Sequence, residues 1–377
     1  MRINWYHYSD TSEPGWEFDP VSLGKMNLLV GETASGKSRF LNTMFHLGRY
    51  AVVNDFYAGN WEIKFEHNGK EYSWELRSRA IKSAQKKGIV EFEKLTRRDG
   101  EKEIELIKRS EKEIVYCGKT LDPLPKGETS LYLLRETEDI GLAYKAFELI
   151  LRRLFDQDAL SSISEFQPIS IGLQSEILEK HDLEIIRRAE LNLNNNLFFL
   201  EKVFPDLYKQ IIEDYKLVFP FVEEVGITDL SKINEYIAFP GIIPVFTIRE
   251  HGSTNWIILP ELSSGMKKVL LIMTDITMLP EGGVYLIDEY ENSLGLNAIN
   301  FFPEFVLSLK KGVQFVVTSH HPYLINQIPP SEWYVLHREG LHVQIQYGQT
   351  NVNKYGKSKQ ELFTQLINDP FFRGMSK

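Results

Sequence analysis

The sequence predicts an α/β protein in which a parallel sheet is interrupted by a β-rich segment and by a helical insertion. Three observations lead to this prediction. A glycine-rich loop at 31–38 separates a strand pattern from a helix pattern, late apolar strands end in polar residues at 288–289 and 318–321, and helical periodicity dominates from about 140 to 238. With 43% of its 377 residues hydrophobic, the chain can bury a core large enough for one domain with insertions or for two domains.

The composition limits the classes of function. Lysine and arginine number 43 and aspartate and glutamate 52, giving a net charge of −9, which argues against a surface that coats nucleic acid but allows a local basic groove. The single cysteine, Cys117, excludes an intramolecular disulfide and a site of several cysteines. The start of the chain lacks a secretory pattern and no apolar run approaches ~18–20 residues, so we expect a soluble, cytoplasmic protein.

The first third of the chain predicts strands around one helix. Residues 2–8 and 26–30 have strand patterns, and 37–50 has the amphipathic pattern of a helix. The chain alternates on both sides of Asn68-Gly69, a dipeptide that strongly indicates a two-residue hairpin. Further alternating segments follow, so residues 60–120 are expected to form a small antiparallel sheet.

The rest of the chain predicts helices and then strands again. Helical patterns cover segments 143–155, 173–204 and 206–219. They contain no sustained heptad repeat, so long coiled-coil arms are not expected. Strand patterns return after Pro240, in segments 241–250, 255–260, 282–289, 312–320 and 332–338. The predicted organisation is a core of residues 1–58 and 239–348, a β-rich segment 59–135, a helical insertion 136–238 and a C-terminal tail 349–377.

The stretch GETASGKS at 31–38 fits the pattern G-x-x-x-x-G-K-[ST] of a P-loop (Walker A). In such a loop the glycines let the backbone approach phosphate oxygens, while Lys37 would reach the β- and γ-phosphates and Ser38 would ligate Mg²⁺. The residues predicted to hold the nucleotide here are Gly31, Thr33, Ala34, Ser35, Gly36, Lys37, Ser38 and Arg39. The expected cofactors are therefore ATP and Mg²⁺.

Two later strands end in residues that suit ATP hydrolysis. The stretch GGVYLIDEYENS at 282–293 predicts a buried strand that delivers Asp288 to the metal (Walker B) and places Glu289 to activate a water. The stretch FVVTSHHPYLIN at 315–326 ends a further strand with histidines that can contact a γ-phosphate. The strands that carry these motifs and the P-loop strand must lie in one parallel sheet, because their chemistry converges on one nucleotide.

With these motifs and the loop ELSSGMKK at 261–268, the chain resembles the ABC-class ATPases, which include transporter subunits, structural-maintenance-of-chromosomes proteins and RecF-like repair ATPases. The resemblance implies that Ser263, Ser264 and Gly265 bind the γ-phosphate of ATP held by another subunit. It also implies that Asn292 and Ser293 belong to a subunit-contact loop, and that His320 rather than His321 is the switch histidine. Two heads would then enclose two ATP molecules.

The loop departs from the Gly-Gly-Gln form of transporters and has the form SSG-x-K-[RK]. In this respect the chain is similar to stand-alone bacterial ATPases related to the ATPase part of overcoming-lysogenization-defect nucleases, which occur in anti-phage operons. The motifs cover about a quarter of the chain. The metal-associated glutamine of this class has three candidates, Gln157, Gln167 and Gln174, of which we favour Gln167.

Three uses of an ATPase cycle remain open. The first is a sensor ATPase that controls a separate nuclease or toxin, because too few residues follow the last strand for a nuclease domain and the acidic pair at 156–158 precedes Walker B. The second is a RecF-like ATPase that binds DNA through the basic segments 77–88 and 94–98. The third is a small-molecule P-loop kinase, which would be a monomer and would give the loop 261–268 no role.

Overall fold

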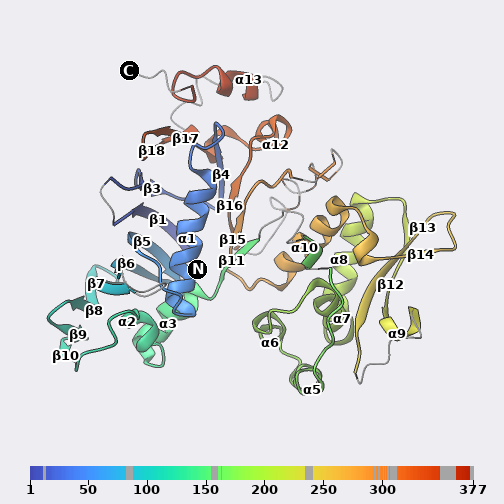
Figure 1. Cartoon of the computed structure of the whole chain (residues 1–377), viewed down its shortest axis with the longest axis horizontal. Helices are drawn as coiled ribbons and strands as arrows, with labels where there is room; N and C mark the ends of the chain where they lie inside the picture. Colours follow the sequence, from blue (N-terminus) through green and yellow to red (C-terminus); the bar gives the residue numbers. More distant parts are fainter. Residues whose placement is uncertain are drawn as a thin grey trace. The chain divides into compact units, whose positions relative to one another are not determined.

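The chain forms two compact units in the computed structural model (Figure 1). The first contains Met1–Arg153, Pro280–Tyr290 and Ser308–Lys377, and the second contains Leu154–Leu279 and Glu291–Leu307. The structure describes all residues except 12–13, 82–87, 154–159, 163, 234–240, 293, 296–297, 300, 302, 304, 306–311, 349–361 and 374–377.

The described part of the first unit is built on a sheet of 15 strands, of which one block of five is parallel. The parallel strands, in spatial order, are β17 (Trp333–Glu339), β4 (Met26–Gly31), β16 (Gln314–Thr318), β15 (Val284–Ile287) and β11 (Ile150–Arg153). Strands β4, β15 and β16 are fully buried, as expected for parallel strands with both faces covered. The prediction that the P-loop, Walker B and histidine strands share one parallel sheet is confirmed. Their carboxyl ends consequently meet at one edge.

The rest of the sheet is largely antiparallel and contains the β-rich segment. Its strands are β1 (Arg2–Ser9), β5 (Gly59–His67), β6 (Lys70–Ala80), β7 (Gly88–Asp99), β8 (Lys102–Ser110), β9 (Ile114–Tyr116) and β10 (Lys119–Thr120). The predicted hairpin at Asn68-Gly69 is confirmed, because His67 pairs with Lys70 and both turn residues have positive φ. Short strands β2 (Glu17–Phe18) and β3 (Val21–Ser22) pair with β1, and β18 (His342–Tyr347) joins β2 to β17.

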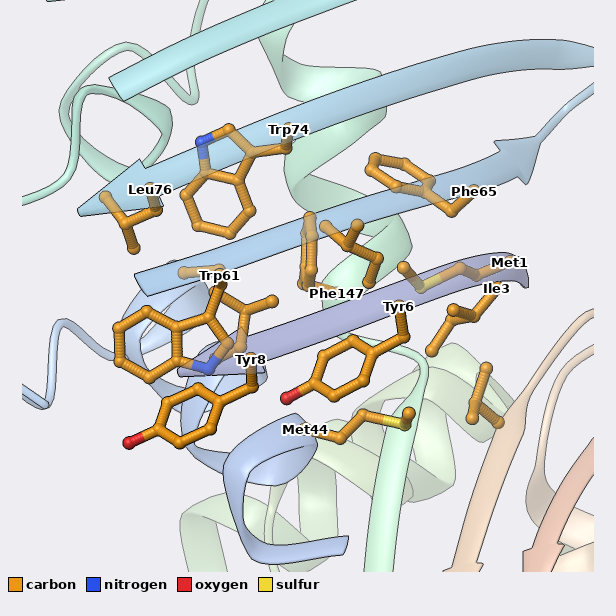
Figure 2. Packing of buried hydrophobic residues seen from close by; sticks show 14 of the residues in the cluster. Met1, Ile3, Tyr6, Tyr8, Met44, Trp61, Phe65, Trp74, Leu76 and Phe147 are labelled. Atoms are coloured by element: carbon orange, nitrogen blue, oxygen red, sulfur yellow. The ribbon is translucent and has the colours of Figure 1, made fainter. Parts of the chain in front are cut away.

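The core of the first unit lies between the antiparallel strands and helices α1 (Lys37–Val52) and α3 (Glu138–Phe147). Figure 2 shows Tyr6 and Trp61 of neighbouring strands facing Met44 of α1, with Phe147 of α3 beside Trp74. The indole nitrogen of Trp61 donates to the carbonyl of Thr43 at 3.1 Å, so the large ring is buried without an unpaired donor. Burial of each such ring contributes about 2–3 kcal/mol, which fixes the P-loop helix to the sheet.

The sequence-based expectation of one helix over residues 143–155 is wrong at its second half. Helix α3 ends at Phe147, and Ile150–Arg153 form strand β11, which pairs in parallel with β15. A short apolar run has the same appearance in a buried helix and in a buried strand, so pairing with β15 decides its structure.

A short helix, α2 (Ser130–Leu133), precedes α3. At the other end of the unit, α12 (Pro322–Gln327) follows β16, the one-turn η2 (Pro330–Glu332) leads into β17, and α13 (Leu362–Ile367) contacts α12.

The second unit combines helices with a sheet of three strands. The helices are α5 (Ile171–Lys180), α6 (Leu183–Arg188), α7 (Leu193–Val203), α8 (Pro205–Val218), α9 (Leu230–Ile233) and α10 (Ser264–Met278). The antiparallel strands are β12 (Val222–Asp229), β13 (Pro244–Glu250) and β14 (Trp256–Ile258), followed by the one-turn η1 (Leu259–Glu261). Helix α10 packs on α7 and α8. Among the described helices of the whole chain, none has the length and apolar character that a membrane crossing requires.

Candidate nucleotide site

The P-loop connects the end of β4 at Gly31 to the start of α1 at Lys37. Gly31 has no room for a side chain, because a Cβ there would lie 2.5 Å from the carbonyl oxygen of Leu336. Gly36 has a φ of 101°, in the left-handed region that favours glycine, and gives α1 no side-chain cap. The first amides of this helix of 16 residues can therefore be offered to phosphate oxygens, where the helix dipole also favours negative charge.

The side chain of Lys37 folds over this loop. Its Nζ donates to the carbonyl oxygens of Gly31 at 2.8 Å and Glu32 at 2.9 Å, and lies 3.5 Å from the Oγ of Ser35. The ammonium is thus held against the backbone of the loop, close to where the P-loop pattern places a phosphate. Thr33, Ala34 and Arg39 lie in the same loop and first turn and are exposed.

Asp288 lies at the carboxyl edge of the parallel strands, just beyond β15. Its Oδ1 accepts a hydrogen bond from the Oγ of Ser38 at 3.0 Å and another from the Oγ1 of Thr318 at 2.7 Å. Its Oδ2 lies 3.8 Å from a guanidinium nitrogen of Arg152, a side chain that is 10% exposed. Mg²⁺ prefers oxygen ligands from one or two protein groups together with phosphates. The Ser38–Asp288 pair fits this ion, which when bound with ATP would neutralise charge on the phosphates.

Glu289 and His320 flank this edge. Glu289 is exposed and has a φ of 47°, and its amide donates to Thr318 Oγ1 at 2.7 Å. His320 is exposed, whereas His321 caps α12 by accepting the amide of Tyr323 on its Nδ1 at 3.2 Å. The side chain of His321 is therefore engaged at the start of α12, and the assignment of His320 to a γ-phosphate stays a prediction.

Behind this edge, His46 of α1 stacks on Tyr57, with ring centroids 4.0 Å apart. Burial, aided by the charges of Arg152 and Arg49, lowers the pKa of His46 to about 4, against about 6.5 in an unfolded chain. Between these values the unfolded chain binds more protons than the folded one, so stability should fall as pH drops from about 6.5 to 4.

The His46→Phe variant tests this dependence because it keeps a ring against Tyr57. Its melting temperature should fall less steeply than that of the parent between pH 6.5 and 4.5. The effect is partial, since burial also lowers the pKa of His67 to about 4. An unchanged slope in His46→Phe would contradict the assignment.

The loop ELSSGMKK lies in the second unit, where Ser263 starts helix α10. The Oγ of Ser263 accepts the amide of Met266 at 3.2 Å, and Ser264 and Ser263 are exposed. The buried Lys268 donates from Nζ to the backbone oxygen of the exposed Asn292 at 2.9 Å. Lys268 thus fixes the residue predicted to lie in a subunit-contact loop to the helix that begins at the serines, within one unit.

The remaining residues predicted from the sequence lie either outside the described residues or in the second unit. Gln157, Ser293 and the acidic pair at 156–158 lie outside the described residues. Gln167 and Gln174 belong to the second unit, where the backbone oxygen of Gln167 accepts from Asn195. In the sequence, Gln157 follows β11, the strand that pairs with the Walker B strand β15.

Three residues at these places were missed by sequence reasoning, namely Thr318, Arg152 and Lys268. Thr318 and Lys268 stood inside recognised motifs, but nothing in the motif specified their partners. Arg152 was hidden because its segment was expected to be helical. The signal that could have found it is an arginine within an apolar run, since a buried guanidinium requires an acidic partner.

A P-loop after one strand of a parallel sheet, with an acidic pair ending a strand two positions away in the same sheet, defines the fold of a P-loop ATPase of the SMC and ABC head type. The sequence matches the family described as "AAA domain, putative AbiEii toxin, Type IV TA system" over residues 26–326, and the chain belongs to this family. Comparison with curated protein sequences finds no match.

The fold is also similar to solved SMC heads. The crystal structure of an SMC head bound to the C-winged helix domain of ScpA aligns with a TM-score of 0.52 at 11% identity, over 92% of this chain and 97% of that chain. The SMC head domain from Thermotoga maritima aligns with a TM-score of 0.44 at 13% identity, over 92% and 99%. An SMC head with an extended coiled coil, bound to the C-terminal domain of ScpA derived from Pyrococcus furiosus, gives 0.46 at 12% identity, over 92% and 96%.

Proposed function

We propose that this protein hydrolyses ATP to ADP and phosphate and that two copies pair head to head around ATP. The observation that carries the proposal is the group of side chains around Asp288, in which Ser38 and Thr318 donate to one carboxylate oxygen beside the P-loop. Asp288 and Ser38 would hold Mg²⁺, Lys37 would hold the phosphates and Glu289 would orient a water for in-line attack. His320 would contact the γ-phosphate.

The second unit would complete the site of a partner copy. The amides at the start of α10, next to Ser263, Ser264 and Gly265, suit a phosphate that belongs to another head. Asn292 would lie at the same contact. Loss of the γ-phosphate would then remove a group shared by two heads, and the pair would open.

Such a cycle would control a separate effector, a nuclease or a toxin, in anti-phage defence. The family description names a putative toxin of a type IV toxin–antitoxin system, which supports a place for this chain in a system of two components. An SMC head that shares this fold is bound by part of ScpA, which supports a partner protein that docks on the head. Expression of this chain with and without its neighbouring genes tests the role: growth arrest by this chain alone would contradict a separate effector.

The DNA-binding alternative has less support. Within the described part of the basic segments, the arginines face carboxylates in the pairs Arg77–Glu75, Arg79–Glu91, Arg97–Asp139 and Arg98–Glu71. Such pairing reduces the positive potential that phosphate binding needs. Strong, salt-dependent affinity for DNA would favour this alternative over effector control.

The native mass of Glu289→Gln with and without Mg-ATP tests head pairing. We expect the mass to double only with Mg-ATP, because this variant should bind ATP and hydrolyse it very slowly. The additional change Ser263→Arg should abolish the doubling, whereas Ser175→Arg, at an exposed serine of α5 in the same unit, should leave it intact.

Two outcomes would contradict head pairing. A mass of one chain under every condition would mean that the loop ELSSGMKK is only an ordinary helix start. It would also favour the kinase alternative. A complex that is already larger without nucleotide would show that other surfaces assemble the heads.

A further inference from the structure

The backbone of Glu289 has an uncommon conformation. Its φ of 47° lies in the left-handed region, which side chains with a Cβ rarely adopt. Such a conformation persists only where surrounding contacts hold it, and it occurs often at functional sites. Since Glu289 follows Asp288 directly, this turn determines where its carboxylate points relative to the metal ligand.

Thr318 supplies the contacts that hold this turn. The amide of Glu289 donates to Thr318 Oγ1 at 2.7 Å, and the same hydroxyl donates to Asp288 Oδ1 at 2.7 Å. The amide of the next residue, Tyr290, donates to the carbonyl oxygen of Thr318 at 3.2 Å. One residue at the end of β16 therefore engages three successive residues of the Walker B turn.

The direction of these hydrogen bonds is determined by the chemistry. A backbone amide can only donate, so the hydroxyl of Thr318 accepts from Glu289 and its own proton goes to Asp288. Thr318 is 0% exposed, so water does not compete for the hydroxyl. Its β-branched side chain has few rotamers, which keeps the hydroxyl in place.

We infer that Thr318 is a positioning residue for the hydrolytic step: its hydroxyl, held by its hydrogen bond to Asp288, orients Glu289 through the amide of Glu289. The inference rests on the proposed function, in which Glu289 activates the water. Thr318 does not touch the reacting atoms itself. Its effect should consequently appear in kcat and should require the carboxylate of Glu289.

The Thr318→Val variant keeps the shape of the side chain and removes the hydroxyl. We expect kcat for ATP hydrolysis to fall about 10–100-fold, the range found when groups that orient a ligand are removed. The Kd for Mg-ADP should change less than threefold, because the P-loop contacts remain. Thr318→Ser should restore at least a third of kcat, since it returns a hydroxyl to the same position.

A double-mutant cycle separates positioning from general damage. If Thr318 acts through Glu289, Thr318→Val should have no further effect on the residual hydrolysis of Glu289→Gln. The matched control is Thr247→Val, at a buried threonine of β13 whose hydroxyl donates to the oxygen of Gly226 at 3.1 Å, and it should leave kcat unchanged.

The outcomes distinguish this inference from the proposed function. The inference is overturned, while the proposed function stands, if kcat of Thr318→Val is within twofold of the parental value. It is also overturned if Thr318→Val lowers kcat by the same factor in the Glu289→Gln background as in the parent. A selective loss of Mg-ADP affinity would assign Thr318 to metal binding and would also overturn it. If the parent does not hydrolyse ATP, the proposed function fails, and if Glu289→Gln hydrolyses ATP at the parental rate, the role proposed for Glu289 fails. If Thr318→Val does not fold, the same double-mutant cycle is made with Thr318→Ser. In that case kcat should fall about twofold in the parent background and should not fall further in Glu289→Gln.

Discussion

The Lys37→Ala variant should bind ATP and ADP about 10–100-fold more weakly than the parent, because a hydrogen bond from a charged donor to phosphate is lost. The ammonium already lies over the loop, within 2.8 Å and 2.9 Å of the carbonyl oxygens of Gly31 and Glu32. Little reorganisation is therefore needed for it to engage phosphate in the parent. The loss should appear in direct titration with a fluorescent nucleotide.

The fold should tolerate the Lys37→Ala change. The side chain of Lys37 is only half-buried, and its removal leaves two carbonyl oxygens that solvent can reach. We expect a melting temperature close to that of the parent in the absence of nucleotide. At the same nucleotide concentration L the parent should gain more stability than the variant, since a ligand that binds only the folded state stabilises it by RT ln(1 + L/Kd), which is smaller when Kd is larger.

Two comparisons make the Lys37 result decisive. Lys102→Ala, at an exposed lysine that begins β8, changes the net charge equally and should keep nucleotide affinity. Glu289→Gln should also bind nucleotide while it hydrolyses slowly. If Lys37→Ala bound and hydrolysed ATP like the parent, the phosphate site would have to lie elsewhere.

The features that sequence could predict are those encoded within one short segment. The glycine loop, the hairpin at Asn68-Gly69 and the apolar strand before Asp288 are each specified by adjacent residues, and the structure contains all three elements. That the strands carrying these motifs share one sheet could be predicted from one further requirement, namely that the ligands of the phosphates and of the metal must lie close together. The predicted roles of the site residues remain predictions.

The features that sequence could not predict depend on register between distant strands. Arg152 lies near Asp288 because β11 pairs with β15 so that Arg152 faces Leu286. Thr318 meets Asp288 because Val317 pairs with Ile287 in the next strand. A shift of one residue would send these side chains to the opposite face, and no local pattern states which register forms.

The Glu93→Ala variant is expected to lose about 3–5 kcal/mol of unfolding free energy, because it removes a fully buried carboxylate that has several partners. Glu93 accepts from the amides of Ser130 at 2.6 Å and Leu131 at 3.1 Å, and from the indole of Trp74 at 3.2 Å. The carboxylate thereby attaches strand β7 to the start of helix α2. Without it, these donors have no solvent to replace their acceptor.

The charge of Glu93 matters as well as its hydrogen bonds. The nearby Arg109 is 3% exposed, and its guanidinium donates to the carbonyl oxygens of Glu128 at 2.7 Å and Pro125 at 2.8 Å. Burial lowers the pKa of Arg109, and because these acceptors are neutral, the negative charge of the nearby Glu93 is the largest effect that opposes this shift and favours the charged guanidinium. Glu93→Gln keeps an acceptor oxygen but not the charge. It should therefore lower the free energy of unfolding by less than Glu93→Ala does, but still measurably.

Glu91→Ala is the matched control for Glu93→Ala, because Glu91 lies two residues earlier on β7 and its side chain is 34% exposed in a pair with Arg79. Surface ion pairs of this kind contribute about 0–1 kcal/mol. Denaturant unfolding should show a large fall in midpoint for Glu93→Ala and a small one for Glu91→Ala, with similar m-values. Equal losses in the two variants would mean that the buried carboxylate does not stabilise the junction of β7 and α2, and that water or a shifted backbone replaces it.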